Sequence, residues 1–432
     1  MTERRSIDIH VPVLARVEGE GALELTLREG RVQSLRLHIY EPPRLFEQFL
    51  VGRSWHEVPD MVARICGICP VAYQMSAAHA IEQAFGVDPG PWVGAMRRLY
   101  YCGEWLQSHA LHIHMLAAPD FAGCESVVAL ARRQPEAVRR GLRLQALGNA
   151  LVAALGARSV HPVGARIGGF SRAPTAGEAA ALLEQVRQAL PDARALLQWT
   201  AALDLPASDQ DFTSVALRHP REYPMNAGRL VSSAGLDIDP GEFEQHFREQ
   251  QVPHSTALHC RLDDQPYLVG PLARVNLNLD RLPPAVLEAL QATGLPWPSR
   301  NMFHSIVARA AEILYACVEA ERLLSAYEAP ESSMVPVTPR AGTGFGCTEA
   351  PRGILWHRYD LDEQGTVTYS RIVPPTSQNQ GRIEQDLTRT LEAAGVECSD
   401  EALRQLSETV IRNYDPCISC ATHFLDLRVD RR

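Results

Sequence analysis

The chain has no lysine: all 42 basic residues are arginine, against 51 acidic residues, and the formal net charge is −9. This absence excludes a P-loop lysine on a phosphate, a Schiff base with pyridoxal phosphate and a Ser–Lys dyad. The acidic balance argues against general nucleic-acid binding, which relies on clustered cations. One local group of arginines has the spacing of a solvated helix face rather than a phosphate track: Arg132, Arg133, Arg139, Arg140 and Arg143.

Long apolar runs are also absent. The first 20 residues lack the uninterrupted hydrophobic segment of a secretory signal. No stretch approaches the ~18 apolar residues of a membrane-spanning helix, and the most apolar piece, 142–157, is interrupted by Gln145 and Asn149. Ten cysteines in 432 residues are too sparse for a disulfide scaffold. We therefore expect a soluble, cytoplasmic protein with reduced thiols and no membrane span.

The hydrophobic pattern predicts an α+β fold that is mainly helical. Alternating residues at 22–28 and 32–39, around a Glu29-Gly30 turn, predict an N-terminal β-hairpin. A second hairpin is predicted near the C-terminus at 356–373, turning at Gln364-Gly365. Apolar residues at three- and four-residue spacing predict a central bundle of long helices, from 61–85, 92–116, 135–155, 176–199 and 305–327, followed by shorter helices at 382–394 and 400–414.

We interpret the chain as a single large domain, 1–432, because no flexible linker divides it. The N-terminal hairpin region is 1–42 and the helical bundle is 43–204. The segment 205–300 is rich in Pro, Gly and short β-like runs, such as 265–272, and is expected to be an inserted α/β region. Residues 301–423 complete the bundle, and 424–432 form a C-terminal tail.

Two Cys-x-x-Cys pairs, Cys66/Cys69 and Cys417/Cys420, stand near opposite ends of the chain. Each pair places two thiolates where one metal ion can bind both. Four cysteines in two such pairs usually indicate structural zinc. However, 347 residues lie between the pairs, whereas a zinc ribbon closes a short loop. Spacing alone leaves structural zinc and a catalytic thiolate-bound metal both open.

The sequences around the pairs carry more information. R-I-C-G-I-C at 64–69 and D-P-C-I-S-C-A-T-H at 415–423 resemble the two signatures of nickel–iron hydrogenase large subunits, R-x-C-G-x-C and D-P-C-x-x-C-x-x-H. Further segments resemble motifs of that family in the expected order: R-V-E-G at 16–19, R-L-F-E at 44–47, H-A-L-H to Asp120 at 109–120, H-P to G-G at 161–169, and E-A-P-R-G at 349–353. The C-x-x-C-P-x-x-Y form and the short length look most like the soluble class that exchanges electrons with NAD(P), the sulfhydrogenases.

This resemblance implies the nickel–iron large-subunit fold and a bimetallic centre. Nickel would be held by the four cysteines, and Cys69 and Cys420 would bridge to an iron that carries CO and cyanide. Glu47 and His423 match the ligands of a further metal in the family, usually magnesium. The implied reaction is the reversible heterolytic cleavage of H2.

The resemblance also implies roles for polar residues. Cys417 is the terminal thiolate that takes the proton, and Glu18 beside it is the next acceptor. Arg352 lies over the open metal position in an electrostatic role, because guanidinium keeps its proton. Asp120 and Asp415 are candidates to pair with Arg352. Without the motif context, each of these residues is more simply a surface, turn or helix-end charge.

The sequence departs from the family pattern in two places. Tyr73 stands where many members have a histidine, so a phenol replaces the imidazole that would contact a bridging sulfur. The P-[ST]-T motif is Pro374-Pro375-Thr376, so a hydroxyl contact to the ligands of the iron either comes from Thr376 or is absent. Pro351, in the E-A-P-R-G segment, is assigned with Thr376 to cofactor binding.

Other subunits must complete the enzyme. The chain shows no further cysteine set for an iron–sulfur cluster and no glycine-rich dinucleotide motif. We therefore expect an iron–sulfur small subunit, and flavin- and NAD(P)-binding subunits of the diaphorase type beyond it. The resemblance implies nickel-insertion chaperones and a maturation endopeptidase that removes 424–432. The remaining cysteines are read as small apolar residues, and no metal is assigned to His109, His112 and His114.

Two rival functions stay open from the sequence. A non-catalytic structural zinc protein would contain zinc without nickel. A relative of the complex I subunit that builds a quinone cavity would share the fold, but that subunit lacks the cysteine pairs. Within the hydrogenase class, the sequence leaves NAD, NADP and the deazaflavin F420 as alternative electron partners.

Overall fold

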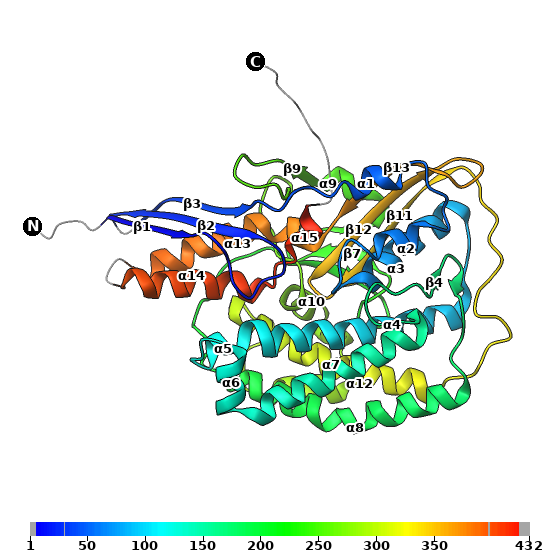
Figure 1. Cartoon of the computed structure of the whole chain (residues 1–432), viewed down its shortest axis with the longest axis horizontal. Helices are drawn as coiled ribbons and strands as arrows, with labels where there is room; N and C mark the ends of the chain where they lie inside the picture. The colour runs from blue at the N-terminus through cyan, green and yellow to red at the C-terminus, as the bar shows by residue number, and fades with distance from the viewer. Residues whose placement is uncertain (1–5, 30, 396–397, 423–432) are drawn as a thin grey trace, which may run out of the picture.

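A computed structural model describes residues 6–29, 31–395 and 398–422. Four long helices lie side by side as a bundle at the bottom of Figure 1: α4 (Gly90–Leu111), α7 (Pro135–Gly156), α8 (Ala176–Ala201) and α12 (Ser305–Ser325). Thr175 caps the start of α8: its side chain accepts from the backbone N–H of Glu178, and the Glu178 carboxylate accepts from the backbone N–H of Thr175. The predicted bundle is confirmed. All four of these helices end within six residues of their predicted bounds.

The predicted helix 92–116 changes character before its end. Helix α4 stops at Leu111, and a π-helix follows at His112–Ala117, before the short helices α5 (Ala118–Phe121) and α6 (Val127–Arg133). The predicted helix 61–85 is two helices, α2 (Val58–Val62) and α3 (Pro70–Phe85). The first cysteine pair occupies the turn between them, because Pro70 has no N–H to donate and starts a new helix instead of continuing the old one.

A three-stranded antiparallel sheet carries helix α3. Its strands are β11 (Gly342–Ala350), β12 (Gly353–Leu361) and β13 (Val367–Val373), in that order. The predicted hairpin is β12–β13, and β11 was not predicted. A Cβ at Gly344 would lie 1.8 Å from the Ala80 carbonyl oxygen, and one at Gly346 would lie 2.0 Å from that of Ser76. Glycine at these two positions lets α3 lie directly on β11.

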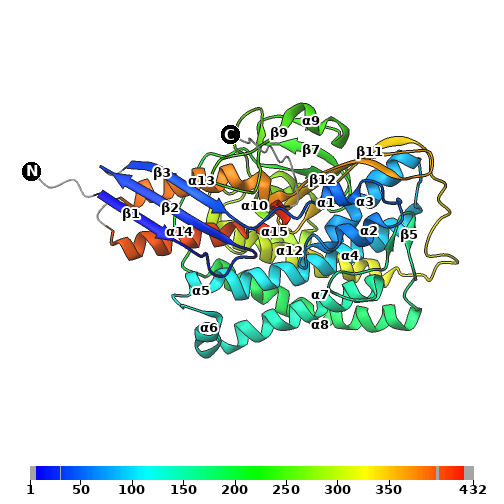
Figure 2. The ribbon, with the colours of Figure 1, turned by 45° about the horizontal axis from the view of Figure 1, so that its top comes forward.

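The N-terminal sheet extends from one end of the molecule (Figures 1 and 2). Its order is β1 (Ser6–Val11), β2 (Gly21–Arg28) and β3 (Arg31–Ile39). Strands β2 and β3 are the predicted hairpin; Gly30 of its turn lies outside the described residues, and β1 was not predicted. Helices α13 (Pro375–Ala394) and α14 (Asp400–Tyr414) pack on this sheet, and α14 has the predicted bounds.

The region 205–300 forms small elements over β11–β13. These are β6 (Val215–Arg218), β7 (Arg229–Ser232), β8 (Asp237–Ile238), η2 (Pro240–Glu242), α9 (Phe243–His246), β9 (Phe247–Gln250), β10 (His259–Leu262), α10 (Pro271–Asn278), η3 (Leu279–Arg281) and α11 (Pro284–Gln291). Its apolar side chains form a second core with Trp356 and Val373. The β-like run at 265–272 was a wrong prediction, because Gly270, at φ 113°, ends the extended stretch and Pro271 starts α10.

The remaining elements are short: α1 (Phe46–Leu50), β4 (Ala165–Arg166), β5 (Gly169–Phe170), η4 (Met302–His304) and α15 (Ile418–Ala421). Helix α15 lies between the N-terminal sheet and β11–β13 in Figure 1, where it contacts α13. Among the described residues, no helix combines the length and the apolarity that crossing a membrane requires.

Candidate metal centre

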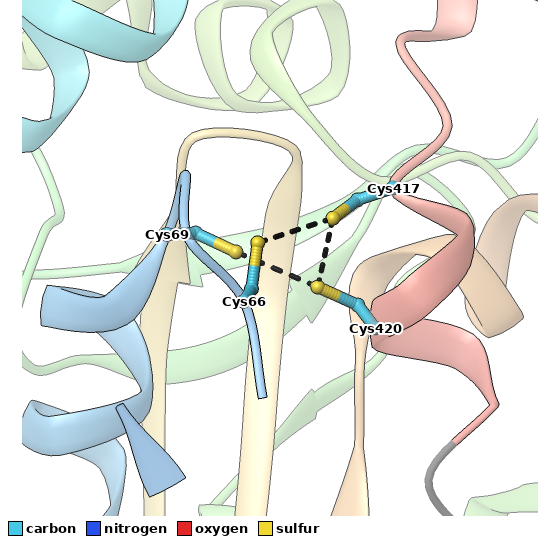
Figure 3. A group of neighbouring side chains, drawn as sticks. All are labelled: Cys66, Cys69, Cys417 and Cys420. Atoms are coloured by element: carbon cyan, nitrogen blue, oxygen red, sulfur yellow. Dashed lines mark hydrogen bonds between the residues drawn. The ribbon is translucent and has the colours of Figure 1, made fainter. Parts of the chain in front are cut away.

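The two cysteine pairs meet in one buried cluster (Figure 3). Cys66 Sγ lies 3.3 Å from Cys417 Sγ, Cys69 Sγ lies 3.6 Å from Cys420 Sγ, and the sulfurs of Cys417 and Cys420 are 2.9 Å apart. All four sulfurs lie within 4.8 Å of one another. An ion that binds thiolates at ~2.3 Å separates neighbouring sulfurs by about 3.3–3.8 Å. The cluster therefore has the dimensions of a single metal centre.

The first pair is held at the start of α3. Cys69 is the residue before the helix, Pro70 is its first residue, and Cys66 Sγ accepts from the backbone N–H of Ile68 at 3.2 Å. Glu104 on α4, wholly buried, accepts from the N–H groups of Val71 and Ala72 at 2.6 and 3.1 Å. This carboxylate satisfies the first N–H groups of the helix and fixes its beginning beneath the sulfurs.

The second pair is attached to the first through the backbone. The N–H of Ile418 donates to the Glu18 carbonyl at 3.0 Å. Arg44 donates to the Ile65 carbonyl at 2.6 Å and also to the Ser419 carbonyl, so one guanidinium holds a carbonyl from each cysteine segment. These contacts join the N-terminal and C-terminal segments of the described chain around the sulfurs.

Arg352 stands beside the sulfurs, at the turn between β11 and β12. Its Nε donates to the Asp415 carbonyl at 2.8 Å, and its Nη2 lies 3.0 Å from Asp415 Oδ1. Arg309 Nη1 lies 3.3 Å from Asp415 Oδ2. Burial opposes the charge of Arg352, but Asp415 and the nearby thiolates hold its pKa above the ordinary value. Burial likewise opposes the charge of Asp415, and Arg352 then lowers its pKa below the usual value.

Of the two candidate partners of Arg352, only Asp415 is paired with it. Asp120 instead forms ion pairs with Arg16 and with Arg412, at 2.7 Å from Oδ2 to Arg412 Nε. The expectation for Asp120 is therefore corrected. Its position explains the difference, because Asp120 follows the π-helix, and its carboxylate faces α14 and the segment before β2.

Glu18 lies against the second cysteine motif. Its Oε2 accepts from the N–H of Ser419 at 3.1 Å, and its backbone forms a bridge with Cys417. Burial and then the charge of Cys66 raise the pKa of the Glu18 carboxyl. A carboxyl with a raised pKa, in contact with the Cys417 side chain, is suited to receive a proton.

Glu47 lies on α1, apart from the sulfurs. Its Oε1 accepts from the N–H of Ile372 at 2.6 Å. Burial and the neighbouring Glu249 raise the pKa of Glu47 to about 8. Two half-buried carboxylates whose charges act on each other are a natural place for a cation. His423, the other expected ligand, lies outside the described residues.

The other predicted residues surround the centre. Thr376 Oγ1, in the first turn of α13, accepts from the N–H of Cys417 at 3.0 Å. Pro351 is buried next to Arg352, and its carbonyl accepts from Arg274 at 3.2 Å. Tyr73 is wholly buried on α3, and burial, then the charges of Cys420 and Cys69, raise its pKa. Its phenol therefore stays protonated beside the sulfurs.

Three sets of residues near the centre were not predicted from the sequence. Arg309 shares Asp415 with Arg352, and Glu104 fixes the start of α3. Arg274 forms ion pairs with Glu312 at 2.6 Å and Glu349 at 2.5 Å, and donates to the Ala350 carbonyl, so it positions the turn that presents Arg352. One signal was available: Arg309, Glu312 and Glu104 are charged residues inside apolar helical runs.

The unassigned cysteines and histidines have ordinary surroundings. Cys102, Cys260, Cys317 and Cys347 are buried, and burial raises the pKa of each thiol. The imidazole of His109 contacts Glu312, that of His112 the Arg412 carbonyl, and that of His114 the Ala110 carbonyl. Each histidine therefore has a partner within the protein.

The site fits the metal that the sequence motifs imply. Four thiolates are soft donors that select nickel, zinc or iron over magnesium or calcium. A structural zinc site, however, needs no buried guanidinium–carboxylate pair beside it. The fold and the site together define a class of protein in which four buried thiolates, two from each end of the described chain, could hold one metal centre.

Comparison with known proteins gives the family. The sequence model of the nickel-dependent hydrogenase family matches residues 44–140 and 241–423 of this chain. The chain is 32% identical to the sulfhydrogenase 2 subunit alpha of Pyrococcus furiosus over 423 residues, 97% of this chain and 100% of that protein. It is 28% identical to the NAD-reducing hydrogenase HoxS subunit beta of Cupriavidus necator over 467 residues, 95% and 94% of the two chains. The chain belongs to the nickel-dependent hydrogenase family.

A solved structure confirms the expected fold. The crystal structure of an NAD+-reducing [NiFe]-hydrogenase in the H2-reduced state superposes with a TM-score of 0.85 and 30% sequence identity, covering 98% of this chain and 100% of that one. The predicted α+β, mainly helical large-subunit fold and the hydrogenase assignment are thus confirmed. The structural zinc protein and the complex I relative are not favoured.

Proposed function

We propose that this chain is the hydrogen-activating subunit of a soluble, cytoplasmic nickel–iron hydrogenase that exchanges electrons with NAD(P). The observation that carries the proposal is the convergence of four buried sulfurs from both ends of the chain. Cys66, Cys69, Cys417 and Cys420 would hold nickel, and Cys69 and Cys420 would share an iron that carries CO and cyanide. When bound, this centre supplies reversible heterolytic cleavage of H2.

The charged residues around the sulfurs position the reaction. Arg352 keeps a positive charge beside the thiolates, where it would polarise H2 and would donate hydrogen bonds to a cyanide on the bound iron. Asp415 fixes the guanidinium through its carbonyl and its carboxylate. Arg309 neutralises the other carboxylate oxygen, so Asp415 stays ionised in a buried site.

Glu18 begins the proton path in this proposal. Cys417 takes the first proton on its sulfur, and Glu18 receives it next, because the carboxyl lies in contact with the Cys417 side chain. Glu18 is partly exposed, so it can pass the proton outward. Thr376 holds the backbone of Cys417 in place during the transfer, and Pro351, buried next to Arg352, would line the bound cofactor.

Magnesium would bind at Glu47 and His423. The support is the half-buried pair Glu47 and Glu249, whose mutual repulsion a divalent cation would relieve. The bound ion would keep several waters and join the C-terminal segment to α1.

Electrons leave through partner chains in this proposal. The relatives are named as alpha or beta subunits, which supports a multi-subunit enzyme. We infer an iron–sulfur small subunit, flavin- and NAD(P)-binding diaphorase subunits beyond it, and no iron–sulfur cluster in this chain. Nickel-insertion chaperones and an endopeptidase that removes 424–432 would mature this chain. The chain would act as a single catalytic domain.

Metal analysis with infrared spectroscopy tests the proposal on the complex purified with its partners. Equimolar nickel and iron, CO and cyanide bands, and H2-dependent reduction of NAD or NADP are expected. Zinc without nickel would overturn the metal assignment, and H2 oxidation that reduces neither nucleotide would overturn the electron partner.

A further inference from the structure

A second cluster of metal-ligand side chains shares no residue with the cysteine centre. His254 lies in the loop between β9 and β10, His259 begins β10, and Glu384 lies on α13. One ring nitrogen of each histidine and one carboxylate oxygen of Glu384 lie within 4.8 Å of one another. His254 Nε2 is 2.8 Å from Glu384 Oε1, and the two imidazoles meet edge to face at 5.8 Å.

Without a metal ion, this cluster is only partly satisfied. The His254–Glu384 hydrogen bond accounts for two of the three residues. His259 is 2% exposed, and its Nε2 has no hydrogen-bond partner among the described residues. Buried polar atoms nearly always have a partner, so this nitrogen needs an explanation. A metal ion bound by the three residues would supply one.

The carboxylate is held in position by the protein. Glu384 Oε1 also accepts from the backbone N–H of Leu37 on β3 at 3.1 Å, and Oε2 has no hydrogen bond within the described part of the chain. A backbone contact of this kind orients a ligating carboxylate and leaves its second oxygen for an ion. Cys260 follows His259 on β10 and so points to the opposite face of the strand.

The donor set is therefore two imidazoles and one carboxylate, without sulfur. Such a set suits zinc and related divalent transition metals rather than magnesium, calcium or copper(I). A tetrahedral ion with bonds of ~2.0–2.1 Å needs ligand atoms about 3.3 Å apart. The His254–Glu384 pair, at 2.8 Å, would open slightly to admit the ion, and all three ligand atoms already lie within 4.8 Å of one another.

We propose that His254, His259 and Glu384 form a second metal site that binds one Zn²⁺-type ion, with water in the open position. The imidazole of His38 on β3 lies 5.8 Å from that of His254 and is engaged by Glu24 at 3.0 Å, so it borders the site. The ion would join the β9–β10 loop to α13, the helix that begins near the sulfurs with Thr376. This inference does not depend on the proposed reaction.

Cobalt(II) distinguishes this site from the cysteine centre, because bound thiolates give intense charge-transfer absorption and imidazole and carboxylate ligands do not. The purified complex, loaded with nickel and iron, is treated with EDTA and titrated with Co²⁺. We expect one equivalent to bind with ligand-field bands and no new thiolate band. Excess Zn²⁺ should displace it. Glu384→Gln and His259→Gln should weaken binding at least tenfold.

His246→Gln is the matched control, because His246 is a partly exposed histidine of the same region, on α9, and should leave binding unchanged. The nickel content of each preparation shows that the variant has folded. Failure of the wild-type complex to bind Co²⁺, or equal binding by folded Glu384→Gln, would overturn the site.

Discussion

Arg352 contacts Asp415 twice, with Nε on its backbone carbonyl at 2.8 Å and Nη2 on its carboxylate at 3.0 Å. Asp415 has a left-handed backbone, at φ 57°, and immediately precedes Pro416 and Cys417. The two contacts therefore fix both the guanidinium and the chain that carries Cys417. The ammonium group of a lysine lacks the planar fork of N–H donors that makes these two contacts.

Arg352→Lys should keep the positive charge and lose the orientation. We expect H2 oxidation to fall about 10²-fold, the size of effect that follows from removing one oriented electrostatic contact, with nickel content unchanged. Hydrogen-dependent dye reduction per nickel measures the loss. Arg358→Lys, at a half-buried surface pair with Glu244, is the control. Full activity in Arg352→Lys would show that orientation is irrelevant.

Arg309→Met should destabilise the chain through Asp415. The substitution leaves the second carboxylate oxygen of a buried aspartate without its cation. Breaking a buried pair costs about 3 kcal/mol or more, against ~1 kcal/mol or less for an exposed pair. Urea unfolding measures the difference, and Arg300→Met, which breaks the exposed pair with Asp211, is the control. Equal losses in the two variants would contradict the role of Arg309.

Cys417→Ser should abolish nickel retention, because a hydroxyl is a poor ligand where a soft thiolate is required. Cys317→Ser removes a thiol on α12 that is equally buried and is not one of the four clustered cysteines. Metal analysis by mass spectrometry should show less than one tenth of the wild-type nickel in the first variant and wild-type nickel in the second. Equal nickel in both would remove Cys417 from the ligand set.

Glu18→Gln should retain nickel but slow proton transfer. The amide keeps the size of the side chain but cannot accept and release a proton as a carboxylate does, so we expect turnover to fall by about 10²-fold, as for loss of a general acid or base. Glu18→Asp should recover part of the activity. Exchange between D2 and water reports the proton step directly, and Glu20→Gln, at an exposed neighbour, is the control. Unchanged exchange in Glu18→Gln would exclude the path.

Stability should fall as the pH is lowered from about 6.5 to 4. Burial lowers the pKa of His114 to about 4, below the ~6.5 of an unfolded chain. In this window the unfolded state binds more protons, so acid favours unfolding, by up to about 3 kcal/mol for one such group. Midpoints of urea unfolding, measured across this pH range, give the slope of stability against pH.

His114→Phe should make that slope shallower, since the phenyl ring can still stack on Trp199 but, unlike imidazole, cannot bind a proton. His10→Phe, at a largely exposed side chain, should leave the slope as it is. A slope in His114→Phe that matches the wild type would mean that His114 does not cause the acid sensitivity.

The sequence predicted the helices well because their apolar residues recur at helical spacing over more than 20 residues. It predicted the four sulfurs because the motifs around them are specific. Strand β11 was missed, since its glycines at 344 and 346 are required by the approach of α3 and show no strand pattern. Arg309 and Glu104 were missed for a related reason: their partners, Asp415 and the start of α3, are distant in sequence.

Arg44 and Glu18 bind the backbone of Ser419. Beside these contacts, the sulfur of Cys66 meets that of Cys417. During synthesis, the N-terminal half of this pocket leaves the ribosome some 350 residues before its counterpart. A shortened polypeptide thus carries only an open half-pocket. The complete set of four thiolates therefore exists only once synthesis has passed Cys420.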